Sequence, residues 1–252
     1  MQPWFRRRLC GQPLRMPGRT LSPVERAVGW MVGMPFASWR YMSRETAIYR
    51  QDSGCPWPIK GFPGDDCRHP GETDTLQRPS SGYGAALRRR YGLQVARPLL
   101  SASELMSVVL NDPNVACPLE IARFERAPDT APGRIQVGEE MRVRLPGPWN
   151  GPVRVVEVTE CSFRLATLRG HLEAGEINFS ARDDGDALVF EIVSYARSSS
   201  RVFDFLYDRL GIASELQLDM WAHFLERVAQ IAGGVPADGI EVHTQRCVDH
   251  PF

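Results

Sequence analysis

The chain has 252 residues, of which 43% are hydrophobic and 24% charged, and its 30 basic side chains balance 30 acidic ones. A soluble globular protein of this length buries roughly three quarters of the surface of its unfolded chain, so its core needs no disulfide or metal. The zero formal net charge argues against a general nucleic-acid binder, because such proteins carry an excess of positive charge to neutralise phosphates.

Residues 1–84 are dense in proline and glycine, which predicts an accessory arm with few regular elements. Ser22 and Pro23 are typical of a helix start, and Pro35 ends that short helix. The apolar stretch at residues 27–39 is too short for a membrane span, which needs about 20 residues. We favour its docking on the main domain over a position on a membrane surface. Peripheral membrane contact or protein contact through this arm stays an alternative.

The arm ends at Gly82-Tyr83-Gly84, which we interpret as a joint and not as a phosphate loop, because no Gly-Lys-Ser/Thr follows. From residue 85 regular hydrophobic periodicity predicts one domain over residues 85–234, followed by a tail over 235–252. A strand is expected at 91–97. Ser101 and Glu104 form the pattern of a capping box, so a helix begins there and ends near Asn111. A short helix or turn is expected at 118–122.

Alternation of apolar and polar residues then predicts an antiparallel meander, with strands around residues 141–145, 153–155, 163–167, 176–181 and 188–194. The turns between strands are expected at 146–152, 170–175 and 183–186. Helical periodicity returns after Ser200 and predicts helices at 202–210 and 212–232, each followed by glycine. The second helix is apolar on a broad surface, which implies burial on more than one side.

This order of elements predicts an α+β helix-grip fold, in which a curved antiparallel sheet wraps on a long C-terminal helix. The order resembles that of the START and birch-pollen-allergen (SRPBCC-like) superfamily. The resemblance implies a cavity between the sheet and the helix, although a fold alone does not define a function.

The run ATLRGHLEAGE at residues 166–176 carries a closer resemblance, together with the strand around Phe190 and the step Tyr195-Ala196-Arg197. These motifs resemble the bacterial and plant family called domain of unknown function nineteen-ninety (DUF1990), over about residues 99–234. Ala166 and Leu172 depart from the glycine and proline that the family often has. The family has no agreed activity, so the resemblance implies a domain and no catalytic residues.

Two facing apolar surfaces, one on the sheet and one on the helix, predict a binding module for an apolar or amphipathic small molecule. Trp149, at the tip of a proline-rich hairpin, is expected either at the mouth of the cavity or packed under the arm. The expected ligand-binding residues are Met141, Val143, Trp149, Phe163, Leu165, Phe179, Phe190, Ile192, Met220 and Phe224.

The alternative is an enzyme of the cyclase, dehydratase or hydrolase kind that uses the same cavity, with His171, Glu176 or Tyr195 as candidate acid or base. The sequence does not decide whether there is turnover, and we favour binding. For His171 and Glu176 we favour a structural interpretation, in which both brace the turn at 170–175 and Glu176 pairs with Arg164 or Arg169. Glu173 is expected to face solvent. An ionisable group that faces the cavity would favour the enzyme.

A third hypothesis is an interaction protein that uses the arm or an arginine-rich outer sheet face. We favour a solvated ladder of arginines and acids on that face over an anion or partner site. The arginines concerned are Arg142, Arg144, Arg154, Arg164, Arg169 and Arg182. The six cysteines include no C-x-x-C pair, which predicts reduced thiols, a cytoplasmic protein and no metal site, and no motif indicates a cofactor.

Overall fold

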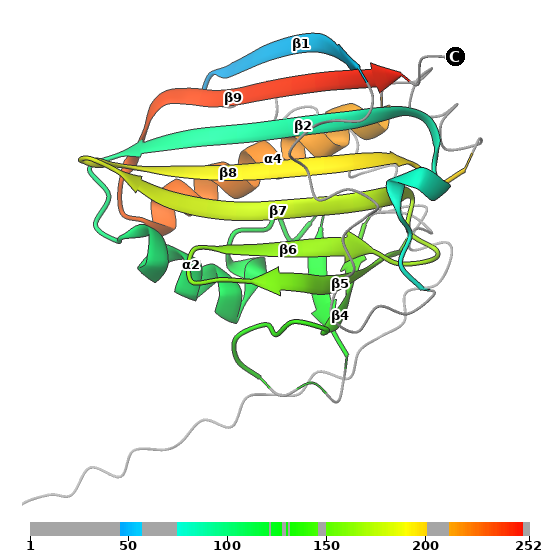
Figure 1. Cartoon of the computed structure of the whole chain (residues 1–252). Helices are drawn as coiled ribbons and strands as arrows, with labels where there is room; N and C mark the ends of the chain where they lie inside the picture. Colours follow the sequence, from blue (N-terminus) through cyan, green and yellow to red (C-terminus); the bar gives the residue numbers. More distant parts are fainter. Residues whose placement is uncertain are drawn as a thin grey trace, which may run out of the picture.

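The computed structural model describes residues 46–56, 75–120, 122–127, 130, 132–145, 150–200 and 212–248. Within these ranges nine strands form one sheet, in the order β1-β9-β2-β8-β7-β6-β5-β4-β3 (Figure 1). The strands are β1 (Ile48–Pro56), β2 (Tyr83–Ala96), β3 (Arg123–Arg126), β4 (Glu140–Arg144), β5 (Asn150–Val158), β6 (Ser162–Thr167), β7 (Glu173–Asp184), β8 (Ala187–Ser198) and β9 (Val235–Val248). The helices are η1 (Pro79–Ser81), α2 (Ala102–Asn111), η2 (Pro113–Val115) and α4 (Ile212–Ile231).

The strands from β4 to β8 follow the predicted antiparallel meander, and β7 and β8 form its longest hairpin. Gly185, with a φ of 63°, occupies the turn of that hairpin, and Gly170, with a φ of 97°, occupies the turn between β6 and β7. Both φ angles lie in the left-handed region that favours glycine. The glycines that predict these two turns are therefore required by the backbone conformation of the turns.

Helix α4 crosses one face of the sheet, which we call the inner face (Figure 1). Its residues Phe224, Leu225 and Val228 are fully buried in a core that also takes in the apolar residues of β2 and β6–β8. Helix α2 adds Leu105 and Met106 to that core. The predicted capping box is present, since the Ser101 side chain accepts a hydrogen bond from the Glu104 N–H and the Glu104 carboxylate accepts one from the Ser101 N–H. A curved sheet that grips a C-terminal helix confirms the predicted helix-grip class.

The structure differs from the predicted order at the C-terminal end. The expected tail at 235–252 contains β9, which inserts between β1 and β2. Its partner β1 comes from the expected arm and pairs with β9 in parallel. Strand β2 begins at Tyr83, eight residues before the strand expected there, and β3 has no counterpart in the prediction. The sheet therefore recruits segments from both sides of the predicted domain.

Cysteine chemistry also differs from the prediction. Cys247 on β9 is disulfide-bonded, whereas Cys117 and Cys161 are free. The expectation of reduced thiols rested on the absence of closely spaced pairs in the sequence, but β1 and β9 place the backbones of Cys55 and Cys247 opposite each other across 192 positions of the chain. The expected helices at 22–35 and 202–210, and the hairpin tip with Trp149, lie outside the described residues.

Neither α2 nor α4, the α-helices of the described ranges, combines the length and the apolar character that crossing a membrane requires.

Candidate functional site

Aromatic side chains meet between the sheet and α4. Phe163 of β6 stacks on Phe179 of β7 with 4.5 Å between ring centroids. Phe179 also lies 5.4 Å from Trp221 and 5.6 Å from Phe224, and Phe224 lies 6.0 Å from Phe190 of β8. These are the centroid distances of aromatic pairs in contact. The rings fill the space between β6–β8 and the middle of α4.

This packing concerns the ten residues that we expected to bind a ligand. Nine of the ten belong to the core or pack against it, namely Met141, Val143, Phe163, Leu165, Phe179, Phe190, Ile192, Met220 and Phe224. Trp149, the tenth, lies outside the described residues. Their inward orientation agrees with the prediction, but where the rings touch one another they leave no room for a ligand. A ligand in the grip would therefore have to lie beside the aromatic cluster.

Polar side chains occupy the inner face beside this cluster, next to the N-terminal half of α4. Arg89 of β2 is only 8% exposed, and its guanidinium donates a hydrogen bond to the Gln217 side chain of α4. Gln217 in turn donates to Glu173 of β7 over 3.5 Å. Glu173 therefore faces the helix and not the solvent, contrary to our expectation. Arg89, Gln217 and Glu173 link the sheet to α4, and we call them the polar end of the grip.

Tyr91 follows Arg89 on the same face of β2 and is 1% exposed. Burial raises the pKa of Tyr91 to about 12, and the Arg89 guanidinium partly offsets this effect. The phenol is therefore protonated at neutral pH and is able to donate a hydrogen bond.

The indole N–H of Trp221 is a further buried donor near the polar end. Trp221 lies one helical turn beyond Gln217 on α4, so the two side chains share a face of the helix. The residue is 5% exposed, and its Nε1 has no hydrogen-bond partner among the described residues. A buried donor without a partner costs roughly 1–3 kcal/mol. The structure thus places an unsatisfied donor beside the aromatic cluster.

His171 has a structural role at the turn between β6 and β7. Its Nδ1 accepts a hydrogen bond of 2.9 Å from the Glu173 N–H, and burial lowers the pKa of the imidazole. The neutral ring therefore holds the turn between β6 and β7, and Gln77 donates to the carbonyls of His171 and Glu173 on the other side. This geometry agrees with the bracing interpretation of His171.

Glu176 and Tyr195 lie opposite each other on β7 and β8, on the face of the sheet that points away from α4. Along β8 the inner residues are Phe190, Ile192 and Ser194, so Tyr195 has the opposite orientation. It is buried but does not belong to the core cluster. Glu176 Oε2 lies 3.7 Å from Arg164 Nη1, as the bracing interpretation expected. Neither residue is an acid or base of the grip, which corrects the hypothesis for Tyr195.

The sequence interpretation missed Arg89, Tyr91, Gln217 and Trp221. A signal for Arg89 and Tyr91 was present, because they continue the alternation of Leu93 and Val95, which are buried on the inner face. On α4 the signal in the sequence is the four-residue spacing of Gln217 and Trp221, which places both side chains on one face of the helix.

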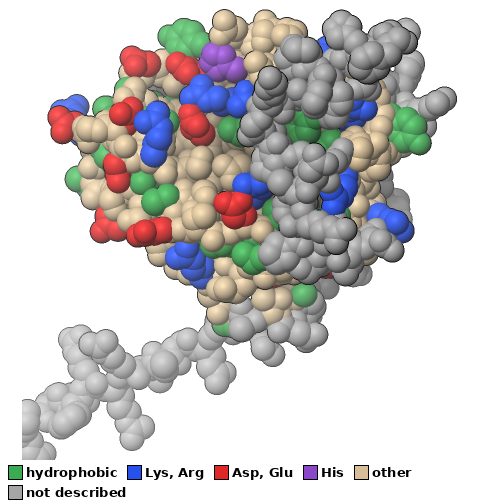
Figure 2. Space-filling view, in the orientation of Figure 1, with side chains coloured by type: hydrophobic (Ala, Val, Ile, Leu, Met, Phe, Trp, Pro, Cys, Tyr) green, Lys and Arg blue, Asp and Glu red, His purple; other side chains and the backbone are tan. Residues whose placement is uncertain are grey.

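On the outer face, the predicted arginines are mostly paired with acids. Arg144 contacts Glu125 at 2.6 Å and Arg154 contacts Glu140 at 2.5 Å, Arg164 pairs with Glu157, and Arg142 and Arg169 are exposed. Figure 2 shows basic and acidic side chains interspersed over the visible part of this face. The arrangement favours a ladder of arginines and acids over a basic stripe. Arg154, however, is buried and not solvated.

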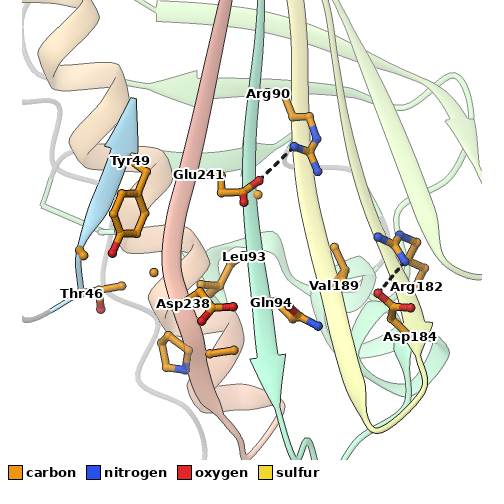
Figure 3. A pocket seen from close by; sticks show the side chains of 15 residues that line it. Thr46, Tyr49, Arg90, Leu93, Gln94, Arg182, Asp184, Val189, Asp238 and Glu241 are labelled. Carbon is orange, nitrogen blue, oxygen red and sulfur yellow. Dashed lines mark hydrogen bonds and ion pairs between the residues drawn. The ribbon is translucent and has the colours of Figure 1, made fainter. Parts of the chain in front are cut away.

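A pocket of about 750 Å³ opens on the outer face where β1, β9, β2, β8 and β7 run side by side (Figure 3). Arg90 and Glu241 approach to 3.4 Å within it, and Arg182 pairs with Asp184 at 3.2 Å. Tyr49 and Asp238 lie on its β1 and β9 side. No group of three or more histidine, cysteine or acidic side chains within the described ranges is placed to hold a metal ion.

Several solved structures are similar to this chain at low sequence identity. A hypothetical protein from Helicobacter pylori matches with 8% identity and a TM-score of 0.42, over 57% of this chain and 86% of the other. Norcoclaurine synthase from Thalictrum flavum, in complex with dopamine and hydroxybenzaldehyde, matches with 12% identity and a TM-score of 0.42, over 58% and 87%.

The di-domain ARO/CYC StfQ from the steffimycin biosynthetic pathway matches with 9% identity and a TM-score of 0.43, over 62% of this chain and 52% of StfQ.

Among curated proteins, no sequence matches this chain. The family described as a domain of unknown function, DUF1990, matches residues 120–226. This region runs from the segment before β3 into α4 and contains the run at 166–176, so the predicted resemblance to the DUF1990 family is confirmed over residues 120–226.

Proposed function

We propose that this protein binds an amphipathic small molecule between the sheet and the N-terminal half of α4. The apolar part of the molecule packs against the edge of the aromatic cluster, and its polar part meets Arg89, Tyr91 and Gln217. The observation that carries the proposal is the buried indole N–H of Trp221, which has no hydrogen-bond partner among the described residues.

An oxygen atom of a ligand would supply the missing acceptor. Proteins pair nearly all of their buried donors, so an unsatisfied N–H beside a polar cluster indicates an acceptor that the described residues do not provide. Arg89 and the protonated Tyr91 add two more donors on the facing strand. The donors favour a ligand with carbonyl, carboxyl or hydroxyl oxygens over a pure hydrocarbon.

Native mass spectrometry of the purified protein tests for a bound molecule, and titration with the fluorescent fatty acid dansyl undecanoate tests affinity. Trp221→Phe keeps an aromatic ring but removes the N–H, so we expect it to weaken binding about three- to tenfold. Tyr49→Phe is the matched control, because it removes a donor from a ring that is 60% exposed on the outer face. A wild-type protein that carries no small molecule and does not bind the probe contradicts the proposal.

An enzyme that uses the same site is the second candidate. Arg89, Tyr91 and Glu173 place ionisable groups on the inner face, which is the feature expected to favour catalysis. Tyr91 would then donate a proton or a hydrogen bond to a substrate oxygen. Incubation of the co-purified molecule with the protein separates the two candidates, since a binding protein returns the molecule unchanged. Contact with a membrane or a protein through the arm remains the alternative that the sequence offers.

A further inference from the structure

The pocket on the outer face owes its shape to two features of the backbone. Between Leu93 and Val95 of β2, strand β9 runs from Ile240 to Pro236, so it has two extra residues and forms a bulge. Bulges redirect side chains and often lie beside binding sites. On β2 the floor is Gly92, which lies between Glu191 of β8 and Glu241 of β9.

The Gly92 floor leaves the pocket open. A Cβ atom at this position would meet nothing closer than the Arg90 guanidinium, at 3.6 Å. Arg90 itself bends over Gly92, and its guanidinium bonds to Glu191 and contacts Glu241 at 3.4 Å. The positive charge of Arg90 is therefore held between two carboxylates at one side of the pocket.

Carboxylates outnumber guanidinium groups at the pocket. Arg182 is neutralised by Asp184 at 3.2 Å, and Arg90 is shared by two acids. Asp238, which the bulge carries, has no ion pair or hydrogen bond with any described residue (Figure 3). In and beside the pocket, four carboxylates face two guanidinium groups, and the His243 imidazole lies 3.7 Å from Glu241. The excess negative charge favours a positively charged occupant.

An aromatic wall completes the site. The Tyr49 ring lies over Gly239, where a Cβ atom would be 3.1 Å from the ring, and Tyr49 is the direct neighbour of Glu241 across β1 and β9. It is 60% exposed. The face of a tyrosine ring attracts ammonium and guanidinium groups within about 6 Å. Tyr49, Asp238 and Glu241 thus offer an aromatic face and two carboxylates on one side of a glycine floor.

We infer that this pocket binds an organic cation, an amine or guanidinium compound, with Asp238 and Glu241 as counter-charges and Tyr49 as the aromatic partner. The site is separate from the grip, since the sheet lies between them. The same chemistry is present in a free polyamine and in the arginine side chain of a peptide, and the two sources are distinguished by the probes.

Titration of the full-length protein, labelled with nitrogen-15 at glycine, with spermidine and with a capped Gly-Arg-Gly peptide tests the inference. We expect one or both cations to shift the amide signals of Gly92 and Gly239. A response to spermidine alone indicates a free polyamine, and a response to the peptide alone indicates an arginine side chain. The uncharged 1,4-butanediol should leave these signals unchanged.

Three variants test the geometry. Gly92→Val places a side chain on the floor, where its Cβ atom would meet nothing closer than the Arg90 guanidinium at 3.6 Å. It should abolish binding as read from the Gly239 signal, while its melting curve shows that the protein is folded. Asp238→Asn should weaken binding about two- to fivefold, and Tyr49→Leu about threefold. Glu125→Gln removes a carboxylate on β3, far along the sheet order from the pocket, and should have no effect. The inference is overturned if neither cation shifts the two glycines, or if Gly92→Val binds like the wild type.

Discussion

Arg89 and Arg90 are neighbours on β2 whose guanidinium groups bond on opposite faces of the sheet. Arg89 bonds to Gln217 of α4 on the inner face, whereas Arg90 bonds to Glu191 of β8 on the outer face. The alternation of a strand therefore assigns one arginine to the grip and the other to the surface pocket. The two arginines allow a comparison, within one strand, of a buried charge with a partly exposed one.

Replacing each arginine by methionine, which has a similar length, should separate the two roles. Arg89→Met removes the donor that satisfies the Gln217 carbonyl, and we expect it to lower the free energy of unfolding by about 1–3 kcal/mol. Arg90→Met breaks a pair whose arginine is 30% exposed, and exposed pairs contribute about 1 kcal/mol or less. Urea denaturation measures both values. Equal losses would show that Arg89 is not the structural link to α4.

Phe179 is the centre of the aromatic cluster, because its ring contacts Phe163, Trp221 and Phe224. Phe179→Ala should lower the free energy of unfolding by about 3–5 kcal/mol, since it removes a buried ring and leaves a cavity. Tyr49→Ala, on an exposed ring, should change it by about 0.5 kcal/mol or less. A small loss at Phe179 in urea denaturation would mean that the rings do not pack as described.

The sequence predicts those parts of the fold in which local patterns decide the structure. The capping box at Ser101, the hairpin of β7 and β8, and helix α4 each follow from the residues within one element. Strand β9 was missed because Pro236 and Gly239 interrupt its alternation, and because its partners β1 and β2 are distant in sequence.

The candidate site was predictable only in part, for a related reason. Periodicity assigns Phe163 and Phe179 to the inner face, but it does not say that their rings touch and fill the space. An arginine in a strand normally faces solvent, so Arg89 appeared to be a surface residue. Only its register with Ser194 and its bond to Gln217 place it inside the grip.

The run at residues 166–176 requires a glycine at position 175, because β7 and β8 approach each other closely there. A Cβ atom at this position would lie 2.0 Å from the Tyr195 carbonyl oxygen and 2.6 Å from the Ala196 Cα, both in the backbone of β8. Gly175→Ala should therefore push β7 from β8 and lower the free energy of unfolding by at least about 1–3 kcal/mol. Gly54→Ala on β1 meets nothing within 4 Å and serves as the control. Urea midpoints that coincide for the two variants would contradict this contact.

The buried phenol of Tyr91 predicts a loss of stability at alkaline pH. Its pKa is raised from 10.0 to about 12, chiefly by burial. A folded state that holds its proton more tightly than the unfolded state is favoured below the unfolded pKa, so this contribution is complete below about pH 10 and is lost as the pH rises towards about 12. The free energy of unfolding should therefore fall between about pH 10 and pH 12 in the wild type, and fall less in Tyr91→Phe. Tyr49→Phe, at an exposed ring, should follow the wild-type curve. If Tyr91→Phe declines as steeply as the wild type, the ring is not buried in the grip, because a phenol exposed to water would ionise with nearly the same pKa in both states.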